Sequence, residues 1–236
     1  MCGRTSLFAP QAAVEERFDA RASQPLEPRY NLAPGEDLAV VRNDAPESID
    51  QLRWGLVPHW ADDPESGPRP INARAETVDE KPTFRDAFAE RRCLVIADGF
   101  YEWKANGKKQ PYRVTIGENE PFAFAGLWER WRRDAGNGED ENEGEDDLRT
   151  VTIITTEANE LVAPIHDRMP VILAADEERR WLAGEGEPKE LLDPYDGSDL
   201  RTYPVSTAVN DPSNDSPAVV EPIDASGGQQ GLDDFA

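Results

Sequence analysis

Short runs of apolar residues, each of strand length, recur along most of the chain and are separated by turn-forming residues. Between them lie a few segments with apolar residues at the spacing of an amphipathic helix. The runs predict strands at residues 38–42, 49–57, 93–97, 100–103, 112–116, 122–128, 150–156, 171–173 and 202–205. The helical spacing predicts helices at residues 9–20, 83–91, 159–163 and 177–182, the second of them capped by Thr83.

The clearest local prediction is an antiparallel meander in the middle of the chain. Asn106-Gly107 is a favoured pair for a tight turn between the strands at 100–103 and 112–116, and a break at 117–119 precedes the strand at 122–128. Many short strands with few interleaved helices predict an α+β fold. We expect a single domain with an antiparallel, partly closed β-sheet core and flanking short helices.

Apolar patterning predicts one domain over residues 2–209. Residues 134–147 are nearly all Asp, Glu, Asn and Gly, which predicts a solvated acidic loop insertion away from any functional site. Residues 210–236 contain Pro, Ser, Gly, Asp and Gln with little to bury, which predicts a disordered acidic tail.

The chain is strongly acidic, with 48 Asp and Glu against 25 Lys and Arg and a formal net charge of -23. Because the acids are spread along a chain that keeps its apolar periodicity, we interpret the charge as a halophilic adaptation to molar salt, which screens self-repulsion over about 3 Å. No basic, apolar leader begins the sequence, and no run approaches the roughly 18 apolar residues of a membrane helix. We therefore expect a cytoplasmic protein, without a membrane segment, that is a monomer.

The number and spacing of the cysteines and histidines argue against a structural zinc site. Cys2, Cys93, His59 and His166 are too few and too widely spaced for a standard structural zinc site. The chain also has no Walker loop or dinucleotide fingerprint. We expect no metal and no cofactor, and we expect Cys93, inside an apolar run, to be a buried filler.

The start of the chain carries a candidate for covalent chemistry. Removal of Met1 would leave Cys2 with a free α-amine beside its thiol. The unperturbed amine titrates near about 7.7 and the thiol near about 8.5, so both have a reactive fraction at neutral pH. The amine can condense with an aldehyde to an imine, and the thiol can then close a thiazolidine ring. This pattern suggests an aldehyde trap, although a cysteine at position 2 usually has no function.

Three polar residues lie in surroundings that suit proton transfer or orientation. Asn72 begins Asn-Ala-Arg-Ala-Glu, Glu102 lies between two aromatic residues, and His166 precedes Asp-Arg. Burial between aromatics raises the pKa of a carboxyl toward neutrality, where histidine already titrates. Each residue also has an ordinary interpretation: Asn72 as a helix cap, Glu102 as a solvent-facing strand residue, His166 as a hydrogen-bonded loop residue.

Six short motifs together resemble one protein family. They are Met-Cys-Gly-Arg at 1–4, Tyr-Asn-Leu-Ala-Pro-Gly at 30–35, Trp-Gly-Leu-Val-Pro at 54–58, Asn-Ala-Arg-Ala-Glu-Thr at 72–77, Asp-Gly-Phe-Tyr-Glu-Trp at 98–103 and His-Asp-Arg-Met-Pro at 166–170. Their types and order are similar to those of the SRAP (SOS response-associated peptidase) family, and they span most of residues 2–206.

The resemblance implies a role in DNA repair: sensing abasic sites in single-stranded DNA and crosslinking to the ring-opened sugar aldehyde. Carried onto this chain, it implies that Cys2 is the nucleophile. Asn72 would orient the N-terminus and the sugar, Glu102 would be the acid/base in imine formation, and His166 would assist opening of the deoxyribose ring.

The resemblance also implies DNA contacts and partners. Arg4, Arg74 and Arg168 would hold phosphates, and Trp60 would stack near the strand junction. The replication machinery is a candidate protein partner, and lyase or self-processing peptidase activity is a further implication of the family. Because the net charge opposes phosphate binding, we expect a local arginine patch around Cys2.

Two other functions remain open at this stage. The first is an N-terminal-nucleophile cysteine peptidase or amidase, in which the amine of Cys2 activates the thiol for acyl transfer. The second is a noncovalent DNA-binding module, which would keep its affinity without Cys2.

Overall fold

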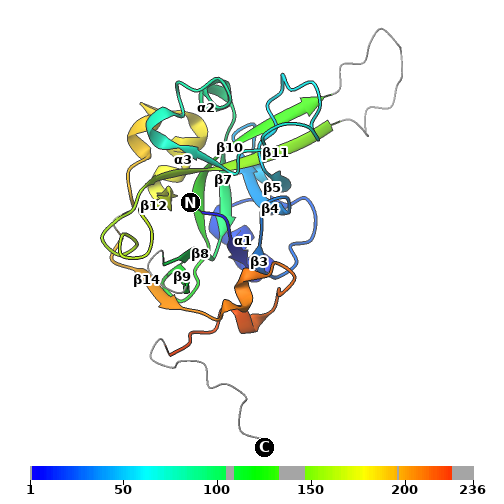
Figure 1. The fold of residues 1–236 in the computed structure, drawn as a ribbon. Helices are drawn as coiled ribbons and strands as arrows, with labels where there is room; N and C mark the ends of the chain where they lie inside the picture. Colours follow the sequence, from blue (N-terminus) through cyan, green and yellow to red (C-terminus); the bar gives the residue numbers. More distant parts are fainter. Residues whose placement is uncertain (1, 105–108, 133–146, 196, 225–236) are drawn as a thin grey trace, which may run out of the picture.

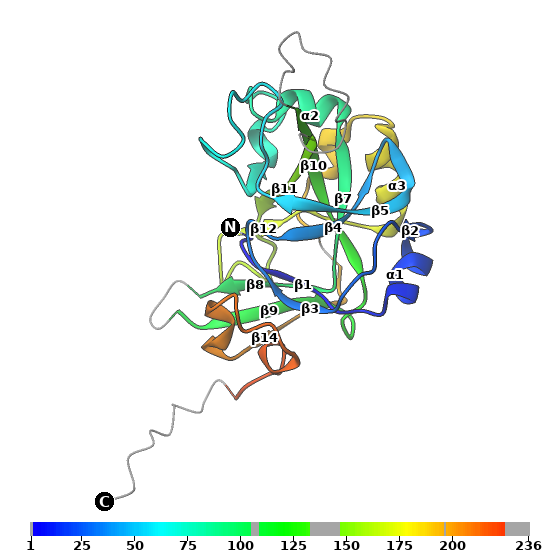
Figure 2. The same ribbon diagram turned by 90° about the vertical axis from the view of Figure 1, so that its right-hand side faces the viewer.

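The computed structural model describes residues 2–104, 109–132, 147–195 and 197–224, which fold around two β-sheets (Figures 1 and 2). The smaller sheet has the order β14-β9-β8-β1-β3. Its strands are β1 (Thr5–Leu7), β3 (Arg29–Leu32), β8 (Gly99–Trp103), β9 (Pro111–Ile116) and β14 (Leu200–Pro204).

The larger sheet has the order β12-β11-β10-β7-β4-β5-β2, with β6 and β13 paired beside this path. Its strands are β2 (Arg21–Ala22), β4 (Asp37–Arg42), β5 (Ala45–Trp54), β6 (Asn72–Arg74), β7 (Arg92–Ala97), β10 (Phe122–Arg132), β11 (Asp147–Glu157), β12 (Arg168–Pro170) and β13 (Ile172–Leu173). Because β5 also pairs with β11, strands β11, β10, β7, β4 and β5 close into a ring. The predicted partly closed sheet is confirmed, although β2–β5, β5–β11 and β6–β11 pair in parallel.

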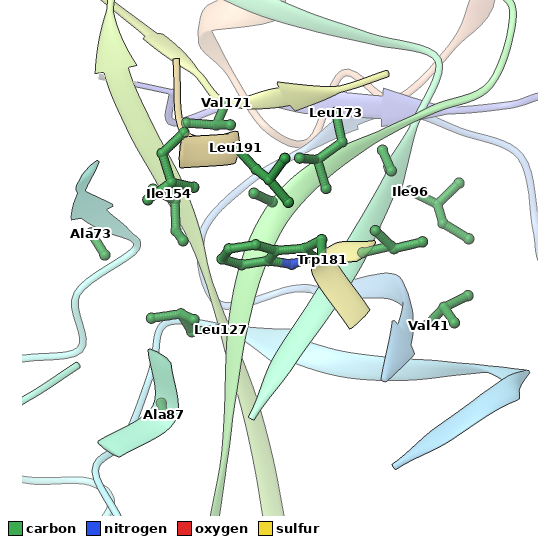
Figure 3. Packing of buried hydrophobic residues seen from close by; sticks show 14 of the residues in the cluster. Val41, Ala73, Ala87, Ile96, Leu127, Ile154, Val171, Leu173, Trp181 and Leu191 are labelled. Atoms are coloured by element: carbon green, nitrogen blue, oxygen red, sulfur yellow. The ribbon is translucent and has the colours of Figure 1, made fainter. Parts of the chain in front are cut away.

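Side chains alternate along the larger sheet, and both of its faces are buried. In β7, Cys93 and Val95 belong to one apolar cluster, whereas Leu94 and Ile96 belong to the other. The cluster that contains Leu94 and Ile96 packs around Trp181 (Figure 3). The Trp181 indole nitrogen donates to the Cys93 carbonyl at 2.9 Å. The cluster that contains Cys93 and Val95 lies between the two sheets and includes the side chain of Cys2.

The helices are short, as predicted. They are α1 (Gln11–Phe18), α2 (Arg85–Glu90) and α3 (Ala175–Ala183), with 3-10 turns η1 (Ala75–Thr77), η2 (Pro188–Leu191), η3 (Thr207–Asn210) and η4 (Pro217–Val219). The prediction of a Thr83 cap is wrong, because α2 is preceded by Phe84 and has no side-chain cap. Residues 159–163 form hydrogen-bonded turns instead of a helix. Within the described residues no helix combines the length and apolar character needed to cross a membrane.

The predicted meander is only half correct. Strands β8 and β9 pair antiparallel, with Phe100 opposite Val114, but β10 leaves this sheet and pairs with β7. The turn between β9 and β10 contains Gly117 and Asn119 with φ of 52° and 73°, left-handed values that redirect the chain. The other edge of β9 is taken by β14. The Asn106-Gly107 turn lies outside the described residues.

The predicted disordered tail is wrong for residues 210–224. This segment continues from η3 into η4, and Val219 is buried. The Asp215 carboxylate accepts hydrogen bonds from the backbone N–H groups of Tyr30 and Asn31 and pairs with Arg29. We call residues 206–224 the C-terminal strap. Residues 225–236 and the predicted acidic insertion, apart from its last residue in β11, lie outside the described residues.

A buried ion pair fixes the start of the chain in the smaller sheet. Arg113 on β9 and Asp98 just before β8 have fully buried side chains, and Arg113 Nη2 lies 3.2 Å from Asp98 Oδ1. The same carboxylate accepts from Ser6 Oγ at 2.7 Å and from the backbone N–H of Phe8. The Asp98 carboxylate therefore holds strand β1 at two points, the Ser6 side chain within the strand and the backbone N–H of Phe8 just after it.

We predict that Asp98→Asn lowers the free energy of unfolding by about 3–5 kcal/mol, because it leaves the Arg113 charge buried without a counter-ion. The matched control is Asp44→Asn, which removes an acid of which about half is exposed and which pairs with Arg42. We expect that control to cost less than about 1 kcal/mol. Urea unfolding measures both, and equal losses would show that the buried pair does not hold the fold.

Candidate functional site

The N-terminal residues lie beside β8 of the smaller sheet. Thr5 pairs with Phe100, and the Tyr101 N–H donates to the Arg4 carbonyl at 3.0 Å. Continuing this antiparallel register places Gly3 opposite Glu102. Strand pairing therefore brings the segment that carries Cys2 next to the Glu102 carboxyl.

The larger sheet supplies the other two candidate residues. Asn72 begins β6, which pairs with β11, and His166 lies in the turn just before β12, which also pairs with β11. In both ribbon views the N mark lies close to β12 and above β8, and Cys2 belongs to the apolar cluster between the two sheets (Figures 1 and 2). The N-terminus therefore enters where the two sheets meet.

The Cys2 thiol is fully buried, with Sγ 4.0 Å from the Arg4 carbonyl. Burial raises the pKa of the thiol far above its usual range, and the negative charge of Glu102 adds to the rise. The positive amino terminus and the Arg4 carbonyl contact oppose it. The thiol is therefore protonated at neutral pH, and it interacts electrostatically with Glu102.

Glu102 is the buried carboxyl that the sequence suggested. Its side chain is almost inaccessible, and burial raises its pKa to about 7. The negative charge of Asp167 raises this pKa further. A carboxyl that is half ionised near neutral pH can both donate and accept a proton there.

His166 is held in a defined tautomer. Its Nδ1 accepts the backbone N–H of Arg168 at 2.9 Å and also lies 3.0 Å from the Asp167 carboxylate. A backbone amide can only donate, so Nδ1 carries the lone pair and the neutral ring has its proton on Nε2. Burial lowers the pKa of His166, as does the amino-terminal charge. His166 is therefore a neutral N–H donor at pH 7.

Asn72 has an amide whose Nδ2 and Oδ1 atoms are both buried and make no hydrogen bond. Leaving a buried polar group unsatisfied costs on the order of 1–3 kcal/mol. Such groups are rare in folded proteins, and each one requires an explanation. An amide with free donor and acceptor capacity can orient an amine and a hydroxyl together.

The three arginines have different environments. Arg4 is anchored, because its Nη1 donates to the Asn31 side chain and to the Val209 carbonyl of the strap, each at 2.8 Å. Arg168 pairs with Glu76 and donates to the Thr155 carbonyl. Arg74 is exposed and, within the described ranges, has no hydrogen bond or ion pair. The expected arginine patch is therefore largely occupied by groups of the protein itself.

Trp60 lies apart from this cluster and is the most exposed large hydrophobic residue described. Its turn is fixed to the end of β10, where the Trp131 indole donates to the Ala61 carbonyl at 2.6 Å. Along β11 the pairing partner of Trp131 lies about 16 Å from that of Asn72. The turn that carries Trp60 is therefore attached to a part of the larger sheet well removed from Asn72.

The second histidine belongs to a separate structural network. His59 Nδ1 lies 2.7 Å from Glu129, whose buried carboxylate also pairs with Arg91. These residues line a depression of about 410 Å³ beside β10. In the described part of the chain no group of three or more His, Cys, Asp or Glu side chains could hold a metal ion.

Two residues near the site were not singled out from the sequence. Asp167 raises the pKa of Glu102, and Glu76 binds Arg168. Both stand inside motifs that were recognised, one directly after His166 and one two residues after Arg74. Nothing in the local sequence indicates the contact, since Glu76 and Arg168 are brought together only by the pairing of β6 and β12 with β11.

Comparison with known proteins identifies a family and several relatives that match most of the chain. The family described as SOS response associated peptidase (SRAP) matches residues 1–212. Abasic site processing protein YoqW of Bacillus subtilis (strain 168) is 42% identical over 231 residues, covering 94% of this chain and 99% of that protein. Abasic site processing protein HMCES of Xenopus tropicalis is 34% identical over 271 residues, covering 94% of this chain and 78% of that protein. A crystal structure of a protein from Bacteroides thetaiotaomicron matches with a TM-score of 0.81 at 28% identity, covering 94% and 100% of the two chains.

We predict that Glu102 makes stability fall as pH rises. Its folded pKa of about 7 is above the usual 4.5, so between those values the folded chain binds more protons than the unfolded chain. The stabilisation from the protonated carboxyl is complete below about pH 4.5 and is lost through pH 7, about 3 kcal/mol in all. Urea unfolding from pH 5 to pH 8 should show a flatter profile for Glu102→Gln.

The control is Glu47→Gln on β5, where the side chain is exposed. It should follow the pH profile of the unmodified protein. Parallel profiles for the unmodified protein and Glu102→Gln would show that Glu102 titrates like an exposed carboxyl.

Proposed function

The chain belongs to the SRAP family, and from that premise we propose that it captures abasic sites in single-stranded DNA covalently through Cys2, after removal of Met1. The product is a thiazolidine between the cysteine and the ring-opened sugar. One observation supports the proposal above the others: the buried Glu102 carboxyl, with a pKa of about 7, lies beside the N-terminal segment and acts electrostatically on the Cys2 thiol. This is the combination that imine chemistry requires at neutral pH.

The reaction begins at the amine. The α-amine of Cys2 attacks the aldehyde carbon C1′ of the open sugar, and the resulting carbinolamine loses one water to give an imine. Glu102, protonated about half of the time near pH 7, donates the proton that lets the hydroxyl leave as water. The same carboxyl can return a proton in the reverse direction, so it serves both formation and reversal.

The thiol acts second. Because burial keeps the thiol protonated, the amine is the better first nucleophile. Once the imine has formed, the sulfur adds to C1′ and the thiol proton passes to the imine nitrogen, closing a five-membered ring. The net change over both steps is the loss of one water.

Asn72 and His166 have roles that suit their geometry. The unpaired amide of Asn72 can accept from the amine and donate to a sugar hydroxyl. His166, neutral with its proton on Nε2, can donate to the ring oxygen when the closed sugar opens to the aldehyde. Arg74 and Trp60 are both exposed, and in the proposed complex Arg74 would bind a phosphate and Trp60 would stack on a base.

The hydrolase alternative is less well supported. Acyl transfer by a cysteine peptidase depends on a thiolate, and burial and the Glu102 charge both oppose ionisation of Cys2. The amine-first route needs no thiolate. The electrostatics therefore favour a carbonyl that the amine can attack, such as an aldehyde.

We predict that the protein forms a covalent adduct with single-stranded DNA that contains one abasic site. Intact mass spectrometry should show the masses of the Met1-free protein and the DNA added together, less one water. Cys2→Ala should give no adduct that survives heating, because the thiazolidine cannot close. Cys93→Ala is the matched control, since Cys93 is the second free and fully buried cysteine and lies within strand β7, and it should retain the adduct.

An adduct yield for Cys2→Ala equal to that of the unmodified protein would contradict the proposal. So would an adduct on a chain that still carries Met1. Cleavage of a peptide substrate with no adduct on abasic DNA would instead support the hydrolase.

We predict that Glu102→Gln slows adduct formation by about 10²- to 10⁴-fold, the usual contribution of a positioned acid/base. The pH–rate profile of the unmodified protein should change slope near pH 7, and the variant should lose that change of slope. Affinity for single-stranded DNA without an abasic site should stay the same in the variant. Loss of that affinity together with the rate would mean that Glu102 only supports the fold.

A further inference from the structure

The carboxylate of Glu76 forms an ion pair with the guanidinium of Arg168. The pair is bidentate: Nη2 lies 3.1 Å from Oε2, and Nη1 pairs with Oε1. About half of the Glu76 side chain is exposed, whereas that of Arg168 is mostly buried. A planar guanidinium presents the same pair of donors to a carboxylate and to a phosphate.

A second arginine acts on the same carboxylate. Arg74 lies opposite Thr155 in the pairing of β6 with β11, and Arg168 donates to the Thr155 carbonyl at 2.6 Å. The hydrogen bond from Arg168 lowers the pKa of Glu76, and the charges of Arg168 and Arg74 lower it further. Arg168 and Arg74 therefore both favour the ionised form of the Glu76 carboxylate, an anion that belongs to the protein itself.

The ion pair is not an optimised structural anchor. Arg168 Nε is buried without an acceptor, so the present arrangement leaves one of its donors unsatisfied. About half of the Glu76 side chain is open to solvent, so an anion can approach the pair from that side. A phosphate arriving from solvent could replace this carboxylate at small cost.

We propose that Glu76 is an internal competitor for a DNA phosphate at Arg168 and Arg74, and that it weakens noncovalent binding of single-stranded DNA. The inference rests on the proposed function, because it takes a nucleic acid as the ligand. A phosphate must displace the carboxylate before it can bind Arg168, while the nearby positive charge of Arg74 favours the same phosphate. Strands without an aldehyde are then released, whereas an abasic strand is retained by its bond to Cys2.

The experiment compares Glu76→Gln with a variant of equal charge change nearby. Asp79→Asn is the matched control, because Asp79 follows in the same segment and pairs with Lys189 at 2.7 Å. Glu76→Ala is a second variant, which removes the acceptor entirely. The probe is single-stranded DNA with one tetrahydrofuran residue, a sugar without a base that cannot open to an aldehyde, so its binding reports noncovalent affinity alone.

We expect Glu76→Gln and Glu76→Ala to bind the probe about 3- to 10-fold more tightly than the unmodified protein, with a steeper salt dependence by about 0.7 in the slope of log K against log salt, as for one added phosphate contact. Asp79→Asn should change the affinity less than about 2-fold, because an exposed charge away from the contact is screened by salt. Thermal unfolding of each variant checks that the fold is retained.

Two results would overturn the inference. Glu76 variants that bind no more tightly than Asp79→Asn would show only a global charge effect, and weaker binding would show that Glu76 is needed to hold Arg168 in place. Adduct formation by the unmodified protein with true abasic DNA is measured in parallel. Absence of that adduct, with tighter probe binding by the Glu76 variants, would sink the proposed chemistry and leave the competitor role intact.

Discussion

The position of the N-terminus depends on the buried charge pair between Arg113 and Asp98. Strand β1 has only three residues, too few for its backbone bonds alone to fix it, and the Asp98 carboxylate adds bonds to Ser6 and to the chain just after the strand. The guanidinium can reach that carboxylate because residue 99 is glycine; a Cβ there would lie 2.5 Å from Arg113 Nη2. Since β1 sets the register with β8, the same interaction determines that the segment before β1 faces Glu102.

The burial that gives Glu102 a useful pKa has an opposite effect on Cys2. Desolvation disfavours the charged form of both groups, so one environment makes the carboxyl a better acid near neutral pH and the thiol a poorer nucleophile. A mechanism that used the thiolate first would conflict with this environment, whereas one that begins at the amine uses it. The buried, unpaired amide of Asn72 also destabilises the folded protein, and in the proposed complex hydrogen bonds to the ligand would offset that free energy.

The sequence predicted what depends on local periodicity and missed what depends on remote contacts. Apolar runs located β4, β7 and β11, whereas the aromatic neighbours of Glu102 left open whether it is buried or faces solvent, and the structure shows it buried. The partner of β10 could not be predicted, because two left-handed residues after β9 send it to the other sheet. The prediction of a disordered tail was wrong for residues 210–224 for a similar reason. A polar, proline-rich segment is typical of disorder, but here Asp215 accepts hydrogen bonds from backbone N–H groups nearly two hundred residues earlier.

The acidic surface and the proposed ligand can be reconciled by separating affinity from retention. A net charge of -23 repels DNA at a distance, and salt screens that repulsion together with the attraction of the few arginines. Neither effect acts on a carbon–sulfur or carbon–nitrogen bond once it has formed. A protein that retains its target covalently therefore needs only brief encounters. If Glu76 competes for Arg168 as proposed, strands that lack an aldehyde would be released, and weak phosphate binding would then contribute to selectivity.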